Sequence, residues 1–157
     1  MKRLKILATT LGVVATTSLL WHSQARADAI DHYQPAVLLK AERALDNGDA
    51  TEALALLEGR VETLRHGSMR AAGDDLICRA HYERGDYAAA EAACDRAVAS
   101  GGNTSTWSYL NNRGVMRLLQ GKLEAAFEDF TEAAGLNPRA RSVKRNLQVA
   151  ERELKGS

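Results

Sequence analysis

The fold is decided by the stretch from Trp107 to Ala140, which reads WSYLNNRGVMRLLQGKLEAAFEDFTEAAGLNPRA. Gly121 lies near its middle, and small residues (Gly114, Ala126 and Ala133) stand at fixed distances on both sides. A glycine permits the left-handed backbone of a tight turn between two helices, and small residues let such helices approach closely. The stretch therefore predicts a helix, a turn at Gly121 and a second, antiparallel helix that ends before Pro138.

The same arrangement occurs twice more, around Gly48 and Gly85, so the three glycines are spaced 37 and 36 residues apart. Asp49 and Asp86 directly follow the first two glycines, where a carboxylate can cap the next helix. Periods of 20 to 50 residues are typical of stacked supersecondary units. The positions seven residues before and five residues after the glycines are again small: Ala41, Cys78 and Gly114, then Ala53, Ala90 and Ala126.

These residues resemble tetratricopeptide repeats (TPR). The third unit carries most of the family pattern, namely Leu110, Asn112, Gly114, Gly121, Ala126, Phe130, Ala133 and Pro138. The second has Gly101-Gly102 where the family has proline, and the first has Arg65 there. The resemblance implies an all-α fold: an α-solenoid of about three TPR-like helix-turn-helix repeats within residues 34–138 (about 34–67, 71–104 and 107–138), followed by a C-terminal capping helix over 139–157.

The first 27 residues have the pattern of a signal peptide. Three basic residues within the first five precede an apolar stretch, Ile6 to Leu20, and Ala25-Arg26-Ala27 forms a small-x-small cleavage site. Cleavage is expected between Ala27 and Asp28, leaving a short lead over 28–33 and a protein that is periplasmic or secreted. A membrane anchor is the alternative, but the apolar stretch of fifteen residues is shorter than the roughly 20 needed to span a bilayer.

The net charge of the protein also depends on this cleavage. The full chain of 157 residues has 21 basic and 20 acidic residues and is 45% hydrophobic, which excludes a disordered chain. This net charge of +1 argues against a nucleic-acid partner. Removal of the signal peptide would leave 17 basic and 20 acidic residues. The C-terminal helix is nevertheless basic, with Arg139, Arg141, Lys144, Arg145, Arg152 and Lys155 against Glu151 and Glu153. This basic face is either a solvated surface or a contact with an anionic component of the cell envelope.

Cys78 and Cys94 fall on the two helices of the second unit, on either side of Gly85. Because helical side chains tilt toward the start of their own helix, the two sulfurs converge at one level, and an exported protein favours a disulfide there. Two buried free thiols are the alternative. Cys78 and His81 also share a helix face, so an uncharacterised metal-binding or enzymatic role stays open, although no fourth ligand is evident.

No other pattern indicates catalysis: the sequence lacks nucleophile, zinc-protease and phosphate-loop motifs, and we expect neither an enzyme nor a cofactor. Asp74-Asp75 is a pair of carboxylates, but it is expected to open a helix, where acidic residues favour the positive end of the helix dipole.

A groove for a protein or peptide partner is what the TPR resemblance implies, lined by the first helix of each repeat. The matching positions are Leu38, Glu42, Arg79, Tyr82, Asn111, Asn112 and Val115. The family's clamp for a terminal carboxylate is absent, because its places hold Leu38, Glu42, Leu76, Ser108 and Asn112. Arg113 replaces a usual leucine, and it either pairs with an acid of a packed helix or reaches the groove. The expected function is a protein-interaction scaffold or adaptor in the bacterial envelope.

Overall fold

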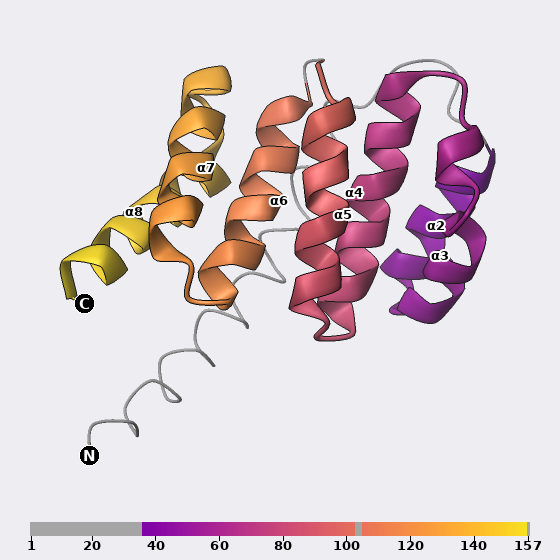
Figure 1. The fold of residues 1–157 in the computed structure, drawn as a ribbon, viewed down its shortest axis with the longest axis horizontal. Helices are drawn as coiled ribbons and strands as arrows, with labels where there is room; N and C mark the ends of the chain where they lie inside the picture. The colour runs from indigo at the N-terminus through magenta and orange to yellow at the C-terminus, as the bar shows by residue number, and fades with distance from the viewer. Residues whose placement is uncertain (1–35, 103–104, 157) are drawn as a thin grey trace. The chain divides into compact units, whose positions relative to one another are not determined.

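A computed structural model describes residues 36–102 and 105–156, which form helices and no strand (Figure 1). The signal peptide, its cleavage site at Ala27-Asp28 and the lead over 28–33 lie outside these residues. Within the described part, no helix combines the length and apolar character needed to cross a bilayer. The elements are α2 (Ala36–Asp46), α3 (Ala50–Leu57), the short 3-10 helix η1 (Val61–Thr63), α4 (Gly67–Glu83), α5 (Tyr87–Ser100), α6 (Thr106–Leu119), α7 (Leu123–Leu136) and α8 (Arg141–Gly156).

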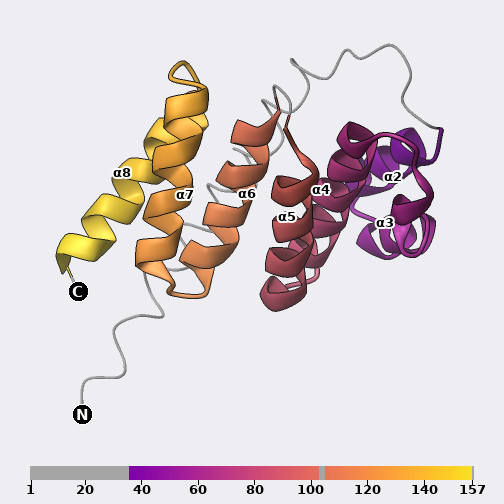
Figure 2. The same cartoon turned by 45° about the horizontal axis from the view of Figure 1, so that its top comes forward.

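The helices form antiparallel pairs, α2 with α3, α4 with α5, and α6 with α7, that stack side by side (Figures 1 and 2). Gly48, Gly85 and Gly121 make the turns with φ values of 79°, 77° and 75°, which confirms their predicted left-handed conformation. The predicted caps are also present. An Asp49 carboxylate oxygen accepts a hydrogen bond from the backbone N–H of Glu52 at 2.8 Å, and Asp86 accepts one from Ala89 at 3.3 Å.

Small residues set the distance between paired helices. Ala41, Cys78 and Gly114, the residues seven places before the turn glycines, are buried within their pairs. A β-carbon at position 114 would lie 2.6 Å from Cε1 of Phe130, so α6 and α7 can pack this closely only with glycine there. The alanine-rich composition therefore serves close helix pairing.

Helix α8 packs against α6 and α7 at the end of the stack (Figure 2). Its Val143 and the preceding Ala140 join Trp107, Leu110 and Ala133 in one buried cluster. The apolar face that the third pair would otherwise expose to water is covered in this way. The expected capping helix is therefore present, beginning at Arg141.

The first pair is irregular. Helix α3 has 8 residues, whereas α5 and α7 have 14 each, and Gly59 (φ 72°) and η1 follow it. Helix α4 then begins at Gly67 and not at residue 71, because no helix-breaking residue separates Gly67 from the remainder of the helix. The prediction that Asp74-Asp75 opens a helix is consequently wrong, since both residues lie well inside α4.

Candidate partner-binding groove

One face of the first helices, α2, α4 and α6, forms the candidate groove. Leu39, Glu42 and Asp46 share a face of α2 by their spacing of three and four residues. This face is directed toward α4, because a carboxylate oxygen of Asp46 lies 3.3 Å from Nη2 of Arg79. Leu39 is 43% exposed, and Glu42 and Tyr82 are half-buried, so these three side chains are open to a partner.

Three of the predicted groove residues are buried, which corrects the sequence assignment. Leu38 is 1% exposed and Val115 is 4% exposed, so both belong to the core. Leu38 packs on α4, where its Cδ2 lies 3.4 Å from the β-carbon position of Gly73. Arg79 is also buried, and it forms ion pairs with Asp46 and with Glu83.

Asn111 and Asn112 are half-buried, and their side chains form a hydrogen-bonded chain across three helices. The amide of Asn146 on α8 donates to the Asn111 side-chain oxygen at 2.9 Å, and the Asn111 amide donates to Asn112 at 3.5 Å. The Asn112 amide in turn donates to a carboxylate oxygen of Asp75 on α4 at 2.8 Å. The two asparagines assigned to the groove therefore connect α4, α6 and α8 to one another.

Asp75, a half-buried residue of α4, ends this chain. Burial raises the pKa of its carboxyl group from 3.8 to about 6, although the hydrogen bond from Asn112 and the charge of Arg79 oppose the rise. The sequence singles out Asp75 as one of two adjacent carboxylates, but it does not reveal this hydrogen bond, because Asn112 is 37 positions away on another helix.

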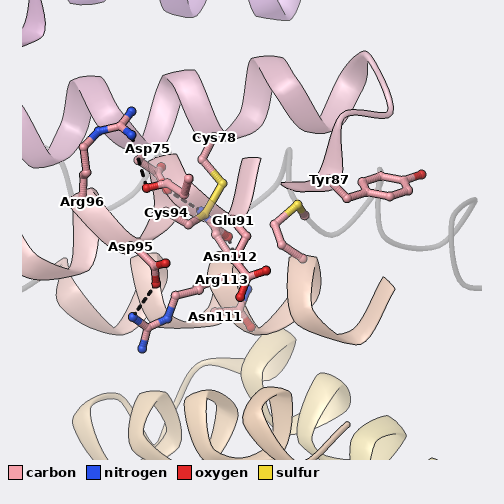
Figure 3. Close-up of a disulfide and its surroundings, with 12 residues drawn as sticks. Asp75, Cys78, Tyr87, Glu91, Cys94, Asp95, Arg96, Asn111, Asn112 and Arg113 are labelled. Carbon is pink, nitrogen blue, oxygen red and sulfur yellow. Dashed lines mark hydrogen bonds and ion pairs between the residues drawn. A yellow bond between two sulfur atoms is a disulfide. The ribbon is translucent and has the colours of Figure 1, made fainter. Parts of the chain in front are cut away.

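Arg113 pairs with acids of the packed helices, which decides between the two interpretations of this residue. Its Nη2 lies 2.7 Å from the buried carboxylate of Asp129 on α7, and its Nη1 lies 3.0 Å from Asp95 on α5 (Figure 3). Arg117 binds the same Asp129 at 3.0 Å and Glu91 at 3.2 Å. These ion pairs connect the second and third helix pairs behind the groove.

The structure contains the predicted disulfide between Cys78 and Cys94, with the two Cα atoms 5.3 Å apart (Figure 3). Both residues are fully buried, and the alternative of two free thiols is wrong. Because its sulfur is bonded to Cys94, Cys78 has no thiolate to offer a metal together with His81. In the part of the chain that the structure describes, no three His, Cys, Asp or Glu residues are grouped to hold a metal ion.

Comparison with solved structures places this geometry in a known fold. The chain matches the first TPR domain of human RPAP3 with a TM-score of 0.68 and 22% sequence identity, over 76% of this chain and 91% of that one. The chain has the fold of a tetratricopeptide repeat domain. The first TPR of Spaghetti (RPAP3), bound to the HSP90 peptide SRMEEVD, matches with the same score and identity over 76% and 93%.

The second TPR domain of human RPAP3, in complex with the HSP70 peptide SGPTIEEVD, matches with a TM-score of 0.65 and 21% identity over 73% of this chain and 92% of that one. No family model matches the sequence, and no curated protein matches it either. At these identities, the agreement is one of TPR fold.

Proposed function

We propose that this protein is an interaction scaffold or adaptor that binds a protein partner, as an extended peptide or a helix, in the groove formed by α2, α4 and α6. The observation that carries the proposal is the match over three-quarters of the chain to TPR domains, two of them solved with bound peptides. The open side chains Leu39, Glu42 and Tyr82 support it, because they offer apolar and polar contacts along one surface.

The charge of the groove favours a basic and apolar partner. Among the described residues around Arg79 on α2 and α4 are four carboxylates (Glu42, Asp46, Asp75 and Glu83), of which Asp46 and Glu83 pair with Arg79. The peptides bound by the neighbouring structures end in acidic EEVD sequences. Such a peptide would meet like charge here, whereas lysine or arginine on the partner would meet opposite charge.

We place this function outside the cytoplasm, in the envelope or the surroundings of a bacterial cell. The signal-peptide pattern of residues 1–27 is the main support. The Cys78–Cys94 disulfide is consistent with it, because disulfides persist in oxidising compartments.

Selection of peptides from a random display library on residues 28–157 tests the groove. We expect the selected peptides to be rich in basic and apolar residues and to bind Glu42→Lys at least tenfold more weakly. Glu132→Lys is the matched control, because it makes the same charge change on an exposed part of α7 and should leave affinity unchanged. Acidic selected peptides, or equal binding to both variants, would contradict the proposal.

A second candidate function is supported by the exposure of the basic residues of α8. Arg141, Lys144, Arg145, Arg152 and Lys155 are all exposed, and they can tether the protein to an anionic envelope component. The two functions use different surfaces and differ in their dependence on salt.

A further inference from the structure

A cavity of about 560 Å³ lies between α3, η1, α4 and α5, away from the groove. It meets a different face of α4, because Arg70, Asp74, Ile77 and His81 line it at helical spacing, whereas Asp75 and Arg79 are directed toward α6 and α2. An inference from this cavity therefore does not depend on the function proposed for the groove.

The cavity exists because the first pair is irregular. Helix α3 ends at Leu57, so no helix of the first pair covers the second half of α5, and η1 fills only part of the space. The α5 wall consists largely of alanines, of which Ala92 and Ala99 are exposed. Small methyl side chains leave the volume open and give it a smooth apolar surface.

Charged side chains surround this apolar wall. The Asp74 side chain is only 8% exposed, and its Oδ1 accepts a hydrogen bond from Nε of Arg96 at 2.7 Å. Burial raises the pKa of Asp74 against the opposing contact with Arg96, and the nearby charge of Glu62 adds to the rise. Asp74 is thus a buried carboxylate, and a further cation beside it would stabilise its ionised form.

The arginines of the cavity are already engaged, whereas two of its carboxylates, Glu58 and Glu62, accept no hydrogen bond from a described side chain, although Glu58 lies within ion-pair distance of His81. Arg96 binds Asp74, and Nη1 of Arg70 donates to the backbone oxygen of Leu64 at 2.9 Å. Glu58 and Glu62 are exposed, and neither forms a hydrogen bond with another described side chain. Nε2 of His81 lies 3.7 Å from Glu58, beyond hydrogen-bond distance.

We propose that this cavity binds a primary ammonium group carried on an aliphatic stem. The ammonium has three donors and no acceptor, so it suits a cavity whose lining includes the carboxylates of Glu58, Glu62 and Asp74. The stem would cover the alanines of α5 and remove their methyl groups from water. A free diamine and the lysine side chain of a partner protein offer the same chemistry, and both can be tested.

NMR titration of the labelled chain over residues 28–157 tests the proposal with four probes: cadaverine, an end-blocked Ala-Lys-Ala tripeptide, pentanol and pentanoate. We expect at least one of the two ammonium probes to shift the amides of Ala92, Ala99 and Glu62. Shifts with cadaverine alone identify a free amine as the source, and shifts with the tripeptide alone identify a lysine side chain. Pentanol and pentanoate separate charge recognition from apolar contact.

Two variants check the assignment. Glu62→Gln removes an exposed carboxylate and Ala92→Leu fills the cavity, and each should weaken binding of the ammonium probe about tenfold. Glu132→Gln on α7 is the matched control and should leave the affinity unchanged, with circular dichroism verifying that all three variants keep their helices. The proposal is overturned if neither ammonium probe shifts these amides, if pentanol or pentanoate shifts them equally, or if the two variants bind as the control does.

Discussion

Asp74 and Asp75 are adjacent in the chain, but their side chains lie on different surfaces of α4. Asp74 pairs with Arg96 of α5 beside the cavity, and Asp75 accepts a hydrogen bond from Asn112 of α6. Successive residues of an α-helix are separated by about 100° around its axis, so one step along the chain changes the neighbouring helix. In each case burial raises the pKa of the carboxyl group, and each charge therefore has a cost to the folded state.

Replacement of Asp75 by asparagine should stabilise the protein at neutral pH. The asparagine oxygen can still accept the hydrogen bond from Asn112, while the buried charge is removed. Because the folded pKa is raised from 3.8 to about 6, the folded state holds the proton more tightly than the unfolded chain. The cost of the charge is thus absent below about pH 4, grows as the pH rises through this range and is complete above about pH 6.

Urea unfolding between pH 4 and pH 7 measures this difference. At pH 7 we expect the Asp75→Asn variant to be more stable than the parent by about 1–3 kcal/mol, and near pH 4 we expect the two to be equal. Glu128→Gln, an exposed change on α7, should follow the parent at every pH. An advantage that does not vary with pH would show that the charge of Asp75 is not its cause.

Asn111, Asn112 and Arg113 show where residue-level prediction reaches its limit. The repeat pattern correctly placed these residues on the first helix of the third pair. Their partners are Asn146, Asp75 and Asp129, which lie 35, 37 and 16 residues away and on other helices. A single sequence does not specify which side chains of stacked helices meet, because a shift of one residue in helix rotation changes every such pair.

Among the elements, the α4–α5 pair is the only one of the described pairs that a covalent bond joins. The Cys78–Cys94 disulfide closes a loop with a sequence separation of 16 residues. A chain-entropy argument assigns such a cross-link about 3 kcal/mol, chiefly because the unfolded chain loses conformational freedom. The bond therefore stabilises two helices that have little large apolar surface of their own.

The variant Cys78→Ala/Cys94→Ala should lose about 3 kcal/mol of unfolding free energy while keeping its helical content. Urea unfolding followed by circular dichroism gives the value, with the parent unfolded in the presence of a reductant as the comparison. We expect the reduced parent and the double variant to unfold at similar urea concentrations. A parent whose midpoint is insensitive to reductant would refute a stabilising role for the bond.

Element lengths were only partly predictable. The turn glycines and the capping Asp49 and Asp86 mark where second helices begin, because these positions have strict backbone and hydrogen-bond requirements. The early end of α3 was missed. It rests on Gly59 and on the packing of Val61 against Gly73, a contact between residues that no local pattern connects. The cavity beside α5, which follows from this early end, was therefore also unpredicted.

For the molecule as a whole, charge is segregated along the chain. Residues 28–157 carry three net negative charges, although residues 139–155 contribute four net positive charges. Residues 28–138 are therefore strongly acidic, and the exposed basic residues of α8 follow them at the C-terminal end of the sequence. Such a distribution suits a tether at α8 and a separate binding surface on the repeats.

Sedimentation with anionic vesicles at increasing salt tests the tether. Binding through α8 should fall steeply between 50 and 500 mM salt, on the order of tenfold or more, because exposed charges are screened within a Debye length. Lys144→Glu/Arg145→Glu should abolish it, whereas Lys40→Glu/Arg43→Glu, a matched change at exposed positions of α2, should not. Equal loss in the two double variants would argue against a site on α8.

The position of the disulfide in the middle helix pair determines where unfolding of this array begins. In a repeat protein each unit contacts only its neighbours, so the terminal units open first when nothing fixes them. Here the covalent bond lies in the second pair, and the ion pairs around Asp129 join that pair to the third. Unfolding should therefore proceed inward from α2–α3 and α8, and proteases would cut the two ends of the array before its centre.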